Sequence, residues 1–182
     1  MKPETLMKIE FEISQIDSLL DENAALLKLV HDKKPDMIEA AALGLFLHSF
    51  YNGVENIMKF AVKEECGKLP SGVKWHKELL DACFEKHGGQ KAMFSEKLKM
   101  ALDDYLSFRH FIRNTYSFKI RWERMEHLVL GIGTNWRDIK AEIGNFIRQP
   151  IGKDTDSAKA AFRLAELGAR GGFPVGVDCT VP

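Results

Sequence analysis

Hydrophobic residues in the first two thirds of the chain recur at steps of three and four, the spacing of one face of an amphipathic helix. From Glu4 to about His31, this spacing is kept by Leu6, Ile9, Ile13, Ile16, Leu20, Leu27 and Val30. The pattern predicts one long helix. A second helix is predicted from Pro35, a residue suited to a first helical turn, to about Gly67.

Glycine and proline mark the boundaries of three further predicted helices. A turn cluster at 67–72, GKLPSG, precedes a short helix over 74–86. The next helix is expected from about residue 95 towards 116, and the last over 121–148. Because no segment alternates with a period of two, the sequence predicts an all-α fold, an up-down helical bundle of about five helices.

The C-terminal segment has a different composition. Residues 150–182 hold five of the 14 glycines and three of the six prolines of the chain. Because glycine and proline are poor helix formers, we expect a helical domain over 1–149 and a loosely structured Gly/Pro-rich tail over 150–182.

Overall composition excludes several classes of protein. The chain has 182 residues with 26 basic and 26 acidic side chains, 45% hydrophobic residues and no long apolar run. These values exclude a disordered chain and a membrane protein, and the N-terminus does not resemble a signal peptide, so we expect a cytoplasmic protein. No metal or cofactor is expected, because no Cys/His ligand spacing and no Gly-rich nucleotide loop occurs.

One segment of this neutral chain is locally basic. Residues 97–124 contain seven Lys or Arg against three Asp or Glu. On a helix, Arg109, Arg113 and Tyr116 would share one face, with His110 and Asn114 on the adjoining strip. Such a group can hold a phosphodiester, because arginine donates two hydrogen bonds to phosphate and an aromatic ring stacks on a base. The alternative is a solvated arginine face, or one paired with carboxylates of the 51–55 turn.

At these residues the sequence resembles the HepT-like proteins of the HEPN superfamily. The segment 108–118 reads FRHFIRNTYSF, close to their motif of arginine, four residues, histidine, one residue and tyrosine. The segments 51–57, YNGVENI, and 70–80, PSGVKWHKELL, also resemble the family, and the likeness extends over roughly 6–146.

The resemblance implies a HEPN ribonuclease toxin that cleaves RNA without a metal, at a site across a homodimer interface. It also implies a partner, an MNT-type nucleotidyltransferase antitoxin. By position, Arg109 matches the motif arginine, and Tyr116 matches the tyrosine that accepts AMP (AMPylation) from the antitoxin in this family. Asn114 stands where the motif has histidine.

The departure at Asn114 bears on catalysis. RNA cleavage through the 2′-hydroxyl needs a group that transfers a proton near neutral pH, and asparagine does not titrate. His110 and His76 are the candidate substitutes, each with the alternative of a surface or packing histidine. His31, His48, His87 and His127 receive no role. Glu55 is either an acid that orients the site or a buried structural partner for Arg109 or Arg113.

Two other hypotheses remain open. The chain can be a catalytically impaired subunit that binds a nucleotidyltransferase, with Tyr116 still modified. It can also be a module that binds nucleotides or RNA through the same basic face without cleaving them.

Overall fold

The computed structural model describes residues 1–86 and 91–148, and within them the protein is helical, with no strand. The elements are α1 (Pro3–Glu22), α2 (Ala24–Asp32), α3 (Met37–Cys66), α4 (Trp75–Ala82), α5 (Glu96–Arg113), the 3-10 turns η1 (Ser117–Lys119) and η2 (Trp122–Arg124), and α6 (Glu126–Ile147). This confirms the predicted all-α class. The predicted tail, 150–182, lies outside the described residues.

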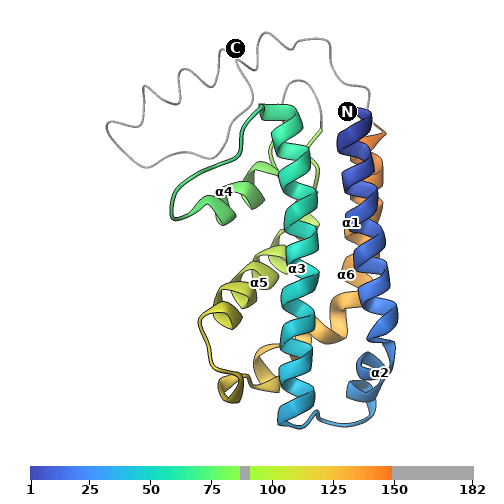
Figure 1. Cartoon of the computed structure of the whole chain (residues 1–182), viewed down its shortest axis with the longest axis vertical. Helices are drawn as coiled ribbons and strands as arrows, with labels where there is room; N and C mark the ends of the chain where they lie inside the picture. Colours follow the sequence, from blue (N-terminus) through green and yellow to red (C-terminus); the bar gives the residue numbers. More distant parts are fainter. Residues whose placement is uncertain (87–90, 149–182) are drawn as a thin grey trace.

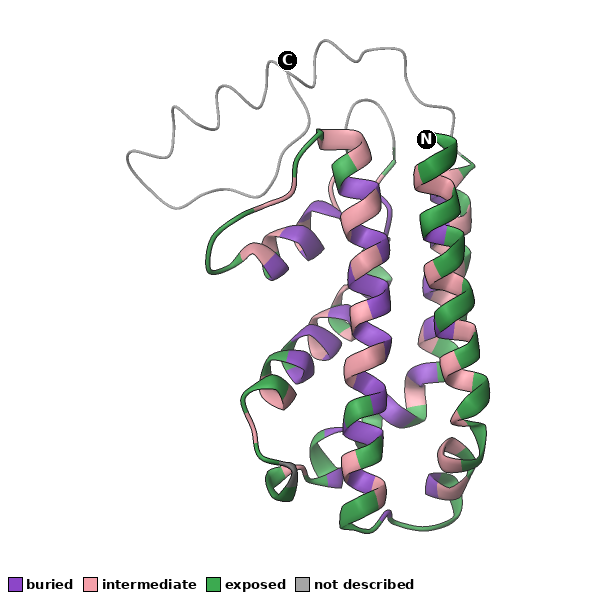
Figure 2. Cartoon of the chain, in the orientation of Figure 1, coloured by how far each residue is buried: buried purple, intermediate pink, exposed green. Residues whose placement is uncertain are grey.

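The long helix α3 is the centre of the bundle. Helices α1 and α6 run along one side of it, and α4 and α5 pack on the other (Figure 1). The chain reverses direction between α1 and α3 and again between α5 and α6, so the predicted up-down arrangement is confirmed. Buried residues follow α3 along most of its length (Figure 2). The central helix α3 therefore supplies part of the polar cluster described below, and α4 and α5, which pack on it, supply the rest.

Both ends of α3 have clear local causes. Asp36 Oδ1 accepts from the backbone N–H groups of Ile38 and Glu39 at 2.8 Å, while Glu39 Oε2 accepts from the Asp36 N–H at 2.9 Å. This capping box satisfies N–H groups that the first turn leaves free. At the other end, Gly67 has φ 76°, a left-handed conformation that glycine adopts without steric cost and that ends the helix.

Four sequence predictions of helix boundaries are wrong. The short helix expected over 74–86 ends at Ala82, and the last helix, expected from 121, begins at Glu126. The other two errors lie at asparagines. The first predicted helix is divided at Asn23, whose side-chain amide donates to the Leu19 carbonyl at 2.8 Å. The fourth ends at Arg113, with Asn114 as its C-cap, so the chain has left the helix before Tyr116. In both places an asparagine side chain bonds to the preceding turn and satisfies a carbonyl there, a local preference that hydrophobic periodicity does not detect.

Polar side chains fix the helices against each other. The Tyr105 hydroxyl donates to the Leu128 carbonyl at 2.9 Å, and Trp136 Nε1 donates to Asp17 at 2.7 Å. Gly53 lets α1 approach α3, because a Cβ there would lie 2.7 Å from Ile16 Cγ1. These contacts hold α5, α6 and α1 in a defined register around α3, the helix that carries most of the site.

Candidate functional site

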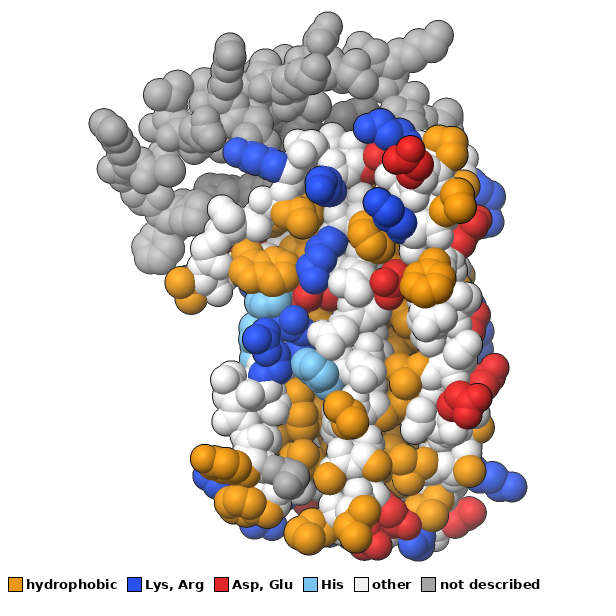
Figure 3. Space-filling model, in the orientation of Figure 1, with side chains coloured by type: hydrophobic (Ala, Val, Ile, Leu, Met, Phe, Trp, Pro, Cys, Tyr) orange, Lys and Arg blue, Asp and Glu red, His pale blue; other side chains and the backbone are white. Residues whose placement is uncertain are grey.

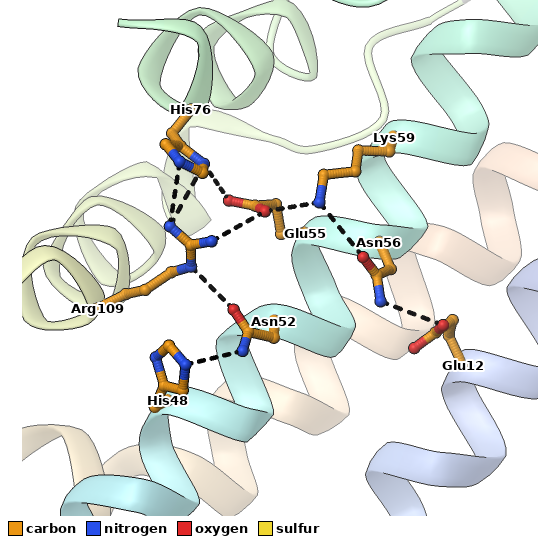
Figure 4. A network of polar contacts seen from close by, with 8 residues as sticks. All are labelled: Glu12, His48, Asn52, Glu55, Asn56, Lys59, His76 and Arg109. Atoms are coloured by element: carbon orange, nitrogen blue, oxygen red, sulfur yellow. Dashed lines mark hydrogen bonds and ion pairs between the residues drawn. The ribbon is translucent and has the colours of Figure 1, made fainter. Parts of the chain in front are cut away.

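Arg109 lies at the centre of a buried polar cluster between α3, α4 and α5 (Figure 4). Four residues after the buried Tyr105, it falls on the inward face of α5, and only 7% of it is exposed. Its Nε donates to Asn52 Oδ1 at 2.9 Å and its Nη2 to Glu55 Oε1 at 3.3 Å. The guanidinium is therefore held in a fixed orientation by α3, rather than moving freely on the surface.

Glu55 is the anion of this cluster. It is 1% exposed, and its Oε1 also receives Lys59 Nζ at 2.8 Å. Burial alone would raise the pKa of Glu55, but the hydrogen bond from Lys59 and the positive charge of Arg109 outweigh it and hold the pKa below its ordinary value. Glu55 is thus a carboxylate at neutral pH, and two cations compensate its single charge.

His76, from the second residue of α4, completes the buried group. Its Nδ1 lies 2.6 Å from Glu55 Oε2, and because an ionised carboxylate only accepts, Nδ1 carries the proton. Nε2 therefore has the lone pair, with Arg109 Nη1 3.3 Å away. Burial lowers the pKa of His76, an effect that the Glu55 hydrogen bond opposes but does not cancel. His76 is a neutral imidazole of defined tautomer at pH 7.

Two more histidines lie beside this group. His110, on the turn of α5 that carries Arg109, presents its ring edge-on to that of His76, with centroids 5.4 Å apart. His48 Nε2 lies 3.0 Å from Asn52 Nδ2, and Asn52 in turn accepts from Arg109. Burial, together with the charges of Arg109 and Arg113, lowers the pKa of His48. Three of the six histidines of the chain thus lie around one arginine, which only His76 contacts directly.

The outer edge of the cluster is cationic and open. Arg113 and His110 are exposed, and within residues 1–86 and 91–148 the Arg113 side chain forms no ion pair or hydrogen bond. Lys59 Nζ lies over the Trp75 ring at 5.1 Å from its centroid. In Figure 3, basic and histidine side chains gather beside α3, next to hydrophobic ones. Positive charge with few acidic neighbours attracts an anionic ligand.

The predicted site residues fall into two groups. Arg109, Arg113, His110, Glu55 and His76 lie together. The other two, Asn114 and Tyr116, do not join them. Arg109 and Arg113 lie one turn apart on α5 as expected, but Tyr116 does not share their face because α5 ends at Arg113.

Asn114 and Tyr116 have surroundings of their own. The exposed Asn114 donates through Nδ2 to the His110 carbonyl at 2.9 Å and so caps α5. Tyr116 is 71% exposed and stacks on Phe118, with ring centroids 5.7 Å apart. Asn114 therefore has a structural role at the motif position, and Tyr116 is accessible from solvent.

Three residues of the cluster have no functional assignment from the sequence: His48, Asn52 and Lys59. A signal for them exists, because His48, Asn52, Glu55 and Lys59 are spaced at i, i+4, i+7 and i+11 and share one strip of α3. A strip of polar side chains on a helix with 14 buried residues marks a polar contact inside the bundle.

Residues 1–86 and 91–148 contain no group of three or more His, Cys, Asp or Glu placed to hold a metal ion. In the same residues, every helix is too short or too polar to cross a bilayer.

Fold and site together define an all-helical bundle with a buried Arg–Glu–His cluster beside the exposed Arg113 and His110. The family model of HepT-like proteins matches residues 42–150, which include every residue of this cluster. The chain belongs to the HepT-like family. Searches of curated proteins and of solved structures gave no match.

Proposed function

We propose that the chain is the toxin component of a toxin–antitoxin pair, an endoribonuclease that cleaves RNA without a metal ion. The observation that carries the proposal is the group of three histidines around Arg109, in which His76 contacts the arginine directly, His110 lies against His76 and His48 is linked through Asn52, with the unpaired Arg113 beside them. Cleavage through the 2′-hydroxyl needs both kinds of group, because histidines transfer protons near pH 7 and arginines stabilise the charge that develops on the phosphate.

The two arginines have different roles in this proposal. Arg113 is exposed and unpaired in the described residues, so it is the group that binds a phosphate from solvent. Arg109 is held on Nε and Nη2 by α3, and only Nη1, whose contacts to His76 are 3.3 and 3.4 Å, is loosely engaged. Arg109 therefore contributes a fixed positive charge and one N–H group aimed towards the histidines.

The test is cleavage of bulk tRNA and mRNA in EDTA by the purified protein. Wild type should cleave, and Arg109→Ala and Arg113→Ala should not, whereas Arg137→Ala, on the exposed face of α6, should keep full activity. Arg113→Ala is the cleaner variant, because Arg109→Ala leaves the buried Glu55 with one cation fewer. No cleavage by wild type, or equal cleavage by all variants, would refute the proposal.

A nucleotidyltransferase antitoxin that transfers AMP to Tyr116 is part of the same proposal. The exposure of Tyr116, 71%, supports it, because a modifying enzyme must reach the hydroxyl. The tyrosine also follows α5 by three residues, so an added phosphate group would lie near the turn that carries Arg113 and would compete with RNA for the same cations.

A second candidate function is a catalytically impaired subunit that binds the nucleotidyltransferase. The observation in its favour is Asn114, which caps α5 and has no titrating group. The variant Asn114→His separates the two: cleavage that appears only in this variant would favour the impaired subunit.

A further inference from the structure

The absence of the motif histidine leaves the proposed reaction without its expected proton carrier. We propose that His76, oriented by Glu55, takes the proton of the RNA 2′-hydroxyl, and that His110 gives a proton to the leaving 5′-oxygen. This inference rests on the ribonuclease activity proposed above. The inference assigns the acid–base chemistry to one histidine on α4 and one in the last turn of α5, and none of it to Asn114.

The geometry supports a division of labour between the two rings. His76 is held by the 2.6 Å contact of Nδ1 with Glu55 and by stacking on Trp75, with ring centroids 3.6 Å apart. His110 is exposed, and its imidazole forms no hydrogen bond within the described residues. With centroids 5.4 Å apart, the two rings can reach the same phosphodiester from two sides.

The tautomer of His76 suits a base. Because Nδ1 donates to the carboxylate, Nε2 presents a lone pair, the arrangement in which a buried acid orients a catalytic imidazole. Arg109 Nη1 lies at nearly the same distance from both ring nitrogens, 3.3 Å from Nε2 and 3.4 Å from Nδ1. A donor placed in this way does not lie along the in-plane lone pair of Nε2, so that lone pair stays able to accept a proton.

Charged groups face His76 from both helices packed against α4. Helix α3 contributes Glu55 and, through it, Lys59, and α5 contributes Arg109 and His110. The two α5 groups and burial lower the pKa of His76, and Glu55 raises it. The balance keeps His76 neutral near pH 7 and therefore able to accept a proton.

The step balances without an oxidant or a water molecule. The 2′-oxygen forms a bond to phosphorus while its proton passes to His76 Nε2, and the P–O5′ bond breaks while the leaving oxygen takes a proton from His110. The products carry a 2′,3′-cyclic phosphate and a 5′-hydroxyl. Exchange with solvent then removes the proton that His76 accepted and gives His110 a new one.

A purely structural role for His76, as a bridge between Glu55 and Arg109, predicts a different result. The experiment measures cleavage of bulk tRNA by the full chain between pH 5 and 9, with the product ends identified. His76→Ala and His110→Ala are compared with His127→Ala, an exposed histidine on α6 outside the cluster. Folding of each variant is checked by circular dichroism and thermal unfolding.

We expect His76→Ala to lose about 10²- to 10⁴-fold in rate, the usual contribution of a general base. It should also lose the rise of rate with pH on the acidic side, and added imidazole should restore part of the activity. His110→Ala should also lose activity, because the leaving oxygen then has no proton donor, while His127→Ala should behave as wild type. If His76→Ala does not fold, His76→Gln, which keeps a polar side chain there, takes the same pH test.

A folded His76 variant that keeps the wild-type rate and pH profile overturns this inference, and so does one that is inactive and does not respond to imidazole. In both cases, loss of activity in Arg113→Ala would leave the ribonuclease proposal standing. No cleavage by the wild-type protein would overturn both proposals together.

Discussion

His76 Nδ1 and Glu55 Oε2 lie 2.6 Å apart, and this contact joins the short helix α4 to the centre of α3. Both groups are almost fully buried, and Arg109 touches each of them. A buried charge is costly unless it is paired, so the three side chains depend on one another. The consequences are measurable in the titration of His76.

The pKa of His76 should lie below its ordinary value of 6.5, since burial favours the neutral form. Histidine NMR over pH 4–8 measures it, with the unfolded chain in urea as reference. Glu55→Gln should lower it further, because the carboxylate is what stabilises the charged form. Because the folded pKa is depressed, His76 contributes stability above pH 6.5 that is lost as pH falls towards the folded value. A His76 pKa above 6.5 would contradict the structure.

Glu65 should produce the opposite pH dependence. Burial raises its pKa to about 7, and its Oε1 has no hydrogen-bond partner within the described residues. Its folded pKa is above the unfolded one, so stability present below about pH 4.5 is lost as pH rises through 7. The free energy of unfolding of Glu65→Gln, measured by urea unfolding relative to wild type, should increase by on the order of 1–3 kcal/mol between pH 5 and 8. A difference that does not change with pH would contradict this.

The capping box of α3 should contribute measurably to stability. Asp36→Ala removes an acceptor for two backbone N–H groups and should reduce the free energy of unfolding by about 1 kcal/mol. Urea unfolding at pH 7 measures the change. Asp32→Ala, an exposed acidic residue at the end of α2, is the matched control and should change stability by less than about 0.5 kcal/mol. Equal effects of the two substitutions would argue against the cap.

Arg113 should contribute to RNA binding as a simple cation. Arg113→Ala should weaken binding of a 2′-O-methyl RNA, which lacks the attacking hydroxyl, and should reduce the slope of log K against log salt by about 0.7. Fluorescence anisotropy at several salt concentrations measures both quantities. Arg137→Ala, whose guanidinium bonds to the neighbouring Asp138, should leave the slope unchanged. An unchanged slope in Arg113→Ala would exclude a phosphate contact at this residue.

Tyr116 should be the acceptor if a nucleotidyltransferase partner modifies this chain. Incubation with the enzyme encoded beside it and labelled ATP should label wild type but not Tyr116→Phe, which keeps the ring that stacks on Phe118. The buried Tyr105 is the control, and Tyr105→Phe should be labelled normally. Labelling of Tyr116→Phe would assign the modification elsewhere. The homodimer stays a prediction, for which light scattering of the purified chain is the direct measurement.

The sequence by itself determined the helical class, the number of main helices to within one, and the segment that carries the basic residues. It did so because helical periodicity and glycine or proline breaks are local properties, readable within a few turns. It also placed Arg109, His110, Arg113, Glu55 and His76 among the candidates. Its errors at Asn23 and Asn114 have a local cause as well, in asparagine side chains that bond to the preceding turn.

Only the tertiary structure decided how these candidates meet. His76 is 21 residues from Glu55 and 33 from Arg109, and His48 reaches Arg109 only through Asn52. No spacing in the chain encodes such contacts, because they arise where three helices cross and bury polar groups that must then be satisfied by one another. The same packing separates Arg113, left open to solvent, from Arg109, held inside. That separation is set by the end of α5 and the covering helix α4, not by the motif in which both arginines occur.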